Sequence, residues 1–358
     1  MLVSISSCTN NKPMTKEQLN IHFFYGEDSY SISKKVSFWI DQFKKKHEGD
    51  TNIDIIEGKE LITKDFGTNL QALPFLAEKR LVIIKDFLDK GSSDDQKIVA
   101  EIIKKTPEFC VLVFTEIKTP DKRLTLFKTL TKLSKTEEFK ALSPGQLAQW
   151  IIKETQDRTS TNTTSTSPST TPATIDMPTA NHLAQHVGPN LWQLSNEIDK
   201  LISSAQTQPD NKITKEMIED LVTPSITSSI FKLTDAIAAR DRRRSINLFK
   251  TLIDSGEETT MVFYMIVRHF RILIQSHYLT EQGESPNNIA KKLKQHPFVA
   301  MTTSKQSKNF TAEKLQTIYK NLLEIDHKFK TGGIKISSDN QMELLLAIEK
   351  FIIETCAT

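Results

Sequence analysis

The sequence of 358 residues is poor in cysteine, and its three cysteines are far apart. Cys8, Cys110 and Cys356 form neither a Cys-x-x-Cys pair nor an even set. That pattern is typical of a reducing cytoplasm and argues against a structural zinc site. No run approaches the ~20 apolar residues of a membrane-spanning helix. The net charge of +3 is too small to indicate nucleic-acid binding by itself. We therefore expect a cytoplasmic protein that has no membrane partner.

A glycine-rich phosphate loop is also missing. The position for it follows the first apolar run, where Gly26 is followed by Glu27 and Asp28. A phosphate loop needs several glycines, whose N–H groups wrap the phosphates, and a Lys-Ser or Lys-Thr pair. Two carboxylates at this turn repel a triphosphate. The third predicted strand ends in Lys85-Asp86, which is not the run of acids expected to hold magnesium. A Gly-Lys pair occurs at Gly58-Lys59, but Glu60 follows it instead of Ser or Thr. We predict that the chain binds no nucleotide cofactor.

Candidate catalytic and metal-binding residues are few. His182 and His186 are four residues apart, but no third ligand is evident, and such a pair is usually polar surface. His269 lies between two arginines, which favours a basic helix face over a general base. No Gly-x-Ser-x-Gly turn is present for a serine nucleophile. We expect no catalytic residues and no metal site.

The first 140 residues alternate between short apolar runs and helix-like patterns. The runs start about every thirty residues, roughly the length of one βαβ unit, so we predict an α/β domain with a parallel sheet. The predicted strands are Ile21–Tyr25, Ile53–Ile56, Leu81–Ile84, Phe109–Phe114 and Glu137–Phe139.

Beyond Leu147 the pattern is helical and apolar residues recur every three or four positions, apart from one segment rich in Ser, Thr, Pro and Asn. The N-terminus resembles a lipoprotein site at Cys8, but it lacks the basic start and the longer apolar core of a secretory signal. The domains we expect are a disordered tail (1–18), an α/β domain (19–142), a small helical domain (143–222) with a disordered insert (157–178), and an all-helical domain (223–358).

The most informative stretch is Gln71–Leu76, just before the third predicted strand. Pro74 removes a backbone donor and biases Leu73 away from the helical region, so a helix should stop here. The chain then presents Leu73, Phe75 and Leu76 on a loop, where a partner could take them. The alternative, that all three pack into the core, is equally compatible with the periodicity.

Basic residues gather in the last domain. They favour either solvated helix faces or sequence-independent contact with DNA phosphates. They are Arg240, Arg242, Arg243, Arg244, Arg268, Arg271, Lys291, Lys292 and Lys294.

Several strings in order along the chain resemble the delta subunit of the bacterial DNA polymerase III clamp loader, from about His22 to the end. They are Phe24–Tyr30, Pro74–Val82, Leu191–Leu201, Ile230–Ile237, Arg268–Leu273, His296–Phe298 and Asp326–Gly332. The chain departs from the family in having Phe75 before Leu76, and in its Ser/Thr-rich insert.

The resemblance implies an AAA+-like domain with a degenerate phosphate loop and no ATP site, a helical lid domain and a helical collar. It implies that Gln71, Leu73, Pro74, Phe75 and Leu76 enter an apolar pocket of the sliding clamp (the beta subunit). The collar is expected to bind the tau/gamma and delta prime subunits, and primed DNA is bound within the assembled loader.

By this resemblance the chain is no enzyme by itself but opens the clamp as part of the DNA polymerase III holoenzyme. Two other hypotheses remain. The chain is an ATP-binding AAA+ protein of related fold, or it is a generic DNA-binding helical protein with an unrelated α/β domain.

Overall fold

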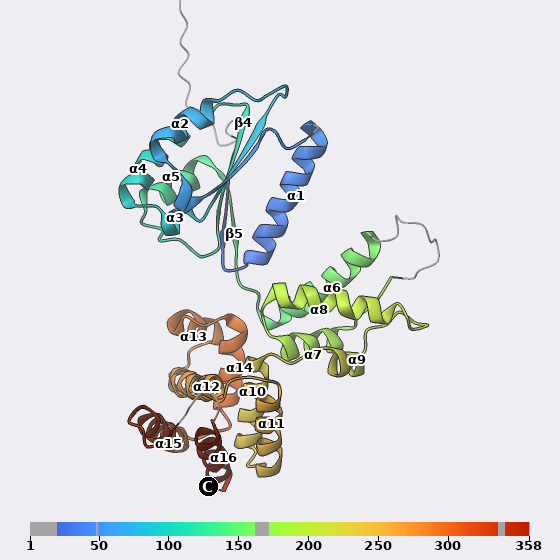
Figure 1. Ribbon diagram of the computed structural model, residues 1–358, viewed down its shortest axis with the longest axis vertical. Helices are drawn as coiled ribbons and strands as arrows, with labels where there is room; N and C mark the ends of the chain where they lie inside the picture. The colour runs from blue at the N-terminus through green and yellow to red at the C-terminus, as the bar shows by residue number, and fades with distance from the viewer. Residues whose placement is uncertain (1–19, 48, 162–171, 336–340, 358) are drawn as a thin grey trace, which may run out of the picture. The chain divides into compact units, whose positions relative to one another are not determined.

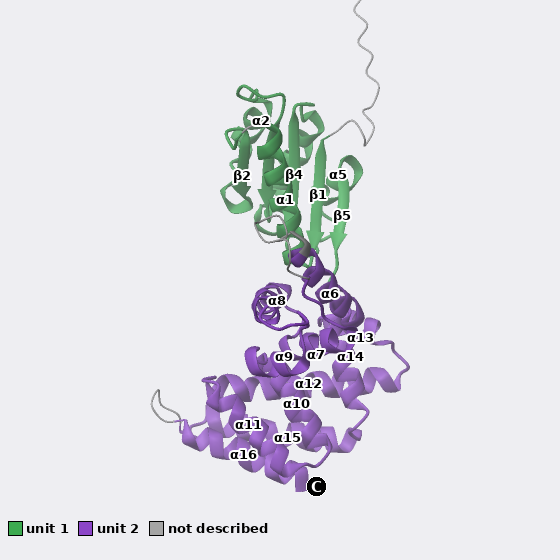
Figure 2. Ribbon diagram, turned by 90° about the vertical axis from the view of Figure 1, so that its right-hand side faces the viewer, with its two compact units in different colours: residues 1–141 green, residues 142–358 purple. Residues whose placement is uncertain are grey.

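The structure is a computed structural model that describes residues 20–47, 49–161, 172–335 and 341–357. The chain divides between Ala141 and Leu142 into two compact units, coloured separately in Figure 2. Unit 1 is α/β, and the described part of unit 2 is helical apart from an isolated β-bridge. The expected tail at 1–18 lies outside the described residues.

Unit 1 is built on a parallel sheet with strand order β2-β3-β4-β1-β5, and its described strands number five, as predicted. The three central strands β1, β3 and β4 carry short runs of buried apolar residues, which fits strands covered on both faces. The strands are β1 (Ile21–Gly26), β2 (Ile53–Glu57), β3 (Arg80–Lys85), β4 (Cys110–Glu116) and β5 (Lys135–Phe139). Because all pairs are parallel, the loops that enter the strands lie at one edge of the sheet and the turns that leave them at the other.

Helices cover both faces of this sheet (Figure 1). On one face α1 (Ser29–His47) packs Ile32 and Val36 against Phe24 of β1. On the other face lie α2 (Thr63–Gln71), α3 (Phe87–Lys90), α4 (Ser93–Ile102) and α5 (Thr125–Leu133). Phe23 and Phe114 point to this second face and are fully buried. Burying a side chain of this size contributes about 1.5–3 kcal/mol, so the two faces together hold the sheet in place.

Unit 2 contains two groups of helices. The first comprises α6 (Pro144–Thr161), α7 (Met177–Val187), α8 (Leu191–Ala205) and α9 (Lys215–Leu221). The second comprises α10 (Ile226–Ala238), α11 (Arg242–Asp254), α12 (Thr259–Glu281), α13 (Pro286–Leu293), α14 (Pro297–Ser307), α15 (Ala312–Lys330) and α16 (Met342–Ala357). Phe249, Phe263 and Phe270 are fully buried at the centre of its largest core.

The expectation of a disordered insert at 157–178 is wrong at both of its ends. Helix α6 continues to Thr161, because the Arg158 guanidinium bonds both Glu154 and the Ser195 carbonyl of α8. Near the other end of the expected insert, the Ala173 side chain is fully buried, and Thr174 forms a β-bridge with Lys212. Composition alone suggested a longer excursion, whereas Thr159, Ala173 and Ile175 of this range are buried. Residues 162–171 lie outside the described residues.

Candidate functional site

The loop between α2 and β3, residues 72–79, carries three apolar side chains that are mostly exposed to solvent. Leu73, Phe75 and Leu76 are 80%, 66% and 92% exposed. Gln71 is the exposed last residue of α2, and Pro74 is half-buried. All five residues predicted as a binding segment therefore lie on one short stretch. The alternative that the three apolar side chains pack into their own core is wrong. We call Leu73, Phe75 and Leu76 the apolar tip.

The backbone of this loop is held although its side chains are not. The Phe75 N–H donates to Asn52 Oδ1 at 2.7 Å, and Asn52 Nδ2 donates to the Phe75 carbonyl at 2.9 Å. Arg80 Nη1 donates to the carbonyls of Asn69 and Ala72, at 2.7 and 3.1 Å, and its guanidinium pairs with Asp54. Neither anchor was recognised from the sequence, because both side chains bond backbone atoms, and Asn52 lies 23 residues from Phe75.

Leu76 has a positive φ of 50°, a region that residues other than glycine rarely adopt. A left-handed leucine costs about 1–2 kcal/mol, and this one recovers little of that by burial, since its side chain is exposed. The surrounding backbone bonds therefore fix a conformation that the apolar tip would not choose by itself.

At the opposite edge of the sheet, the turn after β1 is closed by the protein's own groups. Gly26 has φ +143°, and a Cβ atom there would lie 2.0 Å from the Phe139 carbonyl oxygen of β5. The Asp28 N–H donates to that same carbonyl at 3.2 Å. The nearly buried Asp28 carboxylate accepts from the Ser31 N–H at 2.9 Å and so caps the start of α1. A helix N-terminus at this position could bind a phosphate, but here a carboxylate occupies it.

Two further carboxylates lie at the same edge. Glu116, the last residue of β4, is 2% exposed, and its Oε1 accepts from the Leu88 N–H at 2.6 Å. Burial, with the nearby charges of Asp86 and Asp89, raises the pKa of Glu116 to about 7. Asp86 Oδ1 accepts from the Ile117 N–H at 3.2 Å. This edge therefore presents acids that are already bonded to backbone donors.

Two of the three histidines named as possible functional groups are buried and contact neighbouring protein groups. His186 is buried and its Nε2 lies 2.9 Å from the Val222 carbonyl oxygen, so the expectation of a polar surface pair is wrong for it. The expectation of a basic helix face for His269 is also wrong. Its Nε2 lies 3.0 Å from Gln306 Oε1, and burial lowers its pKa to about 4. A helical period does not tell which face of α12 is covered, and α14 covers this one.

Within the described ranges, no three His, Cys, Asp or Glu side chains gather in a way that could hold a metal ion. The helices that the structure describes include none that is long and apolar enough to span a membrane.

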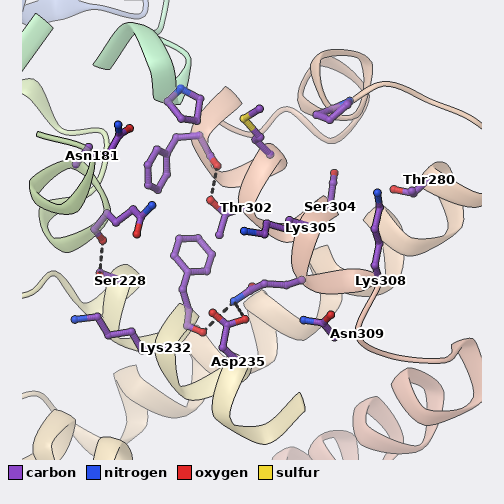
Figure 3. A pocket seen from close by; sticks show the side chains of 18 of the residues that line it. Asn181, Ser228, Lys232, Asp235, Thr280, Thr302, Ser304, Lys305, Lys308 and Asn309 are labelled. Atoms are coloured by element: carbon purple, nitrogen blue, oxygen red, sulfur yellow. Dashed lines mark hydrogen bonds between the residues drawn. The ribbon is translucent and has the colours of Figure 1, made fainter. Parts of the chain in front are cut away.

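Unit 2 contains a pocket of about 610 Å³, shown in Figure 3, between α7, α10 and α14. Asn181, Lys232, Asp235 and Lys305 line it. The buried Gln306 in its lining is satisfied internally, because its Nε2 donates to Asp235 Oδ1 and to the Phe231 carbonyl, both at 2.9 Å. Gln306 thus links α14 to α10 by hydrogen bonds at the wall of the pocket.

The nine basic residues that gather in the last domain are all exposed. Lys292 pairs with Glu284, and Arg268 donates to Gln295. This exposure fits both interpretations of the basic residues, namely solvated faces and phosphate contacts.

Comparison with known proteins assigns the chain to a family. One family model, for the delta subunit of DNA polymerase III, matches residues 22–140, and a second, for the C-terminal domain of the DNA polymerase III delta subunit, matches residues 227–349. The DNA polymerase III subunit delta of Bacillus subtilis (strain 168) is 27% identical over 341 residues, covering 93% of this chain and 92% of that protein. The solved structure of the Bacillus subtilis DNA clamp loader delta protein matches with a TM-score of 0.69 and 25% identity, over 96% of both chains. The chain belongs to the DNA polymerase III delta subunit family.

Proposed function

We propose that this chain is a non-catalytic subunit of a clamp loader, which binds a ring-shaped sliding clamp through Gln71–Leu76 and helps to open it. Membership of the delta subunit family supports the clamp-loader role, as does the name of the related solved structure. The observation that carries the contact site is the apolar tip, whose three side chains are exposed on a loop with a fixed backbone.

The energetics of the tip fit a binding element better than a folding element. Leaving a Leu or Phe side chain in water forgoes about 1.5–3 kcal/mol that burial would contribute. A partner with an apolar pocket recovers that free energy at the interface, where a few central side chains usually dominate affinity. Gln71, at the end of α2, would bond polar groups at the rim of such a pocket.

The double substitution Phe75→Ala with Leu76→Ala tests the contact site. Because two apolar side chains of the tip are lost, we expect clamp binding to weaken about a hundredfold or more, at tenfold per 1.4 kcal/mol. Since both side chains are exposed, the urea midpoint of the variant should match that of the parent. Surface plasmon resonance on the clamp from the same organism, paired with the urea melt, measures both quantities.

Ile117→Ala is the matched control, because Ile117 is 48% exposed and lies at the opposite edge of the sheet. It should bind the clamp like the parent protein. Unchanged affinity in the double variant would rule out the tip as the contact site.

The turn after β1 supports the further proposal that the chain does not bind ATP. The Asp28 carboxylate takes the place of a phosphate at the start of α1, and Asp86 adds negative charge to that edge. A calorimetric titration with ATP and magnesium should give no heat of binding. Micromolar affinity would instead favour the hypothesis of an ATP-binding protein of related fold.

Exposed apolar side chains on α15 and α16 support the proposal of a collar that binds other loader subunits. Leu323 and Leu346 are 60% and 55% exposed. A charge at either position should oppose burial in an interface. Leu346→Glu should therefore prevent co-elution with tau/gamma and delta prime subunits in gel filtration and leave clamp binding unchanged. Normal co-elution would place the contact elsewhere.

A further inference from the structure

We propose that Asn52 is a positioning residue that holds the apolar tip ready for the clamp, an inference that rests on the function proposed above. One side-chain amide bonds both backbone groups of Phe75. Asn52 Oδ1 accepts from the Phe75 N–H at 2.7 Å, and Asn52 Nδ2 donates to the Phe75 carbonyl at 2.9 Å. Asn52 thus acts on Phe75 as a neighbouring strand would, and leaves the Phe75 ring exposed.

The backbone of Asn52 is itself hydrogen-bonded to the sheet. Asn52 immediately precedes β2, and its own carbonyl accepts from the Leu81 N–H of β3 at 2.8 Å. Leu81 is paired with Ile53 in the parallel ladder and is buried. The position of the amide is therefore fixed by the β2–β3 pairing of the sheet rather than by the loop that it holds.

The second anchor secures the base of the loop on the α2 side. The Arg80 side chain is largely buried, pairs with Asp54, and donates to the carbonyls of Asn69 and Ala72. Arg80 thus fixes the point at which the chain leaves α2, and Asn52 fixes Phe75, three residues further on. Between and just beyond these two points lie Leu73 and Leu76. Their orientation follows from the two anchors, since the exposed side chains contribute little packing of their own.

A loop held in this way loses less conformational freedom on binding than a free loop, so more of the contact energy appears as affinity. If the tip instead samples many conformations, the apparent dissociation constant rises in inverse proportion to the competent fraction. Asparagine suits the position because its amide both donates and accepts. Aspartate can still accept from the Phe75 N–H, but it has no donor for the carbonyl, and alanine offers neither group.

The test compares four full-length proteins for clamp binding by surface plasmon resonance: the parent, Asn52→Ala, Asn52→Asp and Thr51→Ala. Thr51 is the matched control because it is exposed in the same turn. We expect Asn52→Ala to bind about tenfold more weakly and Asn52→Asp to fall between it and the parent. Thr51→Ala should bind like the parent. Hydrogen exchange should be faster at the Phe75 amide in Asn52→Ala and unchanged at Leu81, whose bond to the Asn52 carbonyl remains.

A double-mutant cycle separates positioning from direct contact. Added to Phe75→Ala with Leu76→Ala, the Asn52→Ala change should weaken binding by no more than about twofold, because two of the three side chains that it positions are gone. A full additional tenfold loss would mean that Asn52 touches the clamp itself, which overturns the positioning role.

Two other outcomes separate this inference from the proposed function. If Asn52→Ala binds within twofold of the parent while the Phe75→Ala, Leu76→Ala variant does not bind, the positioning role is wrong and the tip remains the contact site. If the latter variant binds like the parent, the clamp contact and the positioning role both fail.

Discussion

The two edges of the sheet in unit 1 treat their loops in opposite ways. At the carboxyl edge the turn after β1 is sealed, since Gly26 fits against Phe139 and the Asp28 carboxylate caps α1. At the amino edge the loop before β3 bonds its backbone through Asn52 and Arg80 but leaves its apolar side chains in water.

The carboxyl edge of a parallel sheet is where such folds usually bind ligands. Here the carboxylates of Asp28, Glu116 and Asp86 at that edge accept from backbone donors, and the exposed apolar tip lies at the other edge. The following predictions test each edge in turn.

The largest expected effect is on the sealed turn. Gly26→Ala places a Cβ atom against the backbone of β5 at a φ of +143°, so strands or turn must shift. We expect a loss of more than about 3 kcal/mol in the free energy of unfolding. Urea melts measure it, with Gly145→Ala as the control, because a Cβ atom there meets nothing within 4 Å. Equal midpoints for the two variants would show that the turn has room for a side chain.

The next effect is a pH dependence at the same edge. Glu116 has a folded pKa of about 7 against an ordinary value of 4.5. The folded state therefore binds more protons between those values, and the contribution of Glu116 to stability falls as pH rises through that window. Glu116→Gln keeps an oxygen for the Leu88 N–H and removes the charge. It should be about 2–3 kcal/mol more stable than the parent at pH 8 and similar to it at pH 4.

Urea melts of both proteins across that pH range measure the difference. A constant difference at all pH values would mean that the carboxylate is not the titrating group.

The sequence predicted the sheet and several helices because their apolar residues recur at regular spacing. All five predicted strands are present, with ends displaced by a few residues. Helices α13 and α14 were expected only as part of the all-helical domain, although Ser285-Pro286 and His296-Pro297 are start signals for individual helices. On α14, buried residues such as Phe298 and Gln306 are spread around the helix, so no single stripe marks it.

The loop before β3 shows where sequence reasoning ended. Pro74 indicated that a helix stops here, and the periodicity left open whether the three apolar residues are exposed or packed in the core; they are exposed. Nothing in the local pattern pointed to Asn52, whose partner is distant in sequence and bonded only through backbone atoms. Backbone groups look the same in every sequence, so their long-range partners require coordinates.

A smaller effect is expected at the cap of α1. Asp28→Ala removes the carboxylate that bonds the Ser31 N–H, and loss of such a cap costs about 1 kcal/mol. Removing the carboxylate opens the helix end but supplies neither further glycines nor a lysine. We therefore expect that this variant still does not bind ATP. A urea melt and a calorimetric titration measure both expectations. Gain of ATP binding would show that Asp28 alone closes the site.

The smallest effect on the free energy of unfolding is expected when a side chain of the apolar tip is truncated. Leu76 is 92% exposed and keeps its positive φ through backbone bonds, so Leu76→Ala should change the free energy of unfolding by less than about 0.5 kcal/mol. Leu130→Ala is the matched control, because that leucine of α5 is fully buried and its truncation should cost about 2–5 kcal/mol. Urea melts compare the two. If Leu76→Ala were as destabilising as Leu130→Ala, the tip would be part of the core, and both edges of the sheet would bury their loops.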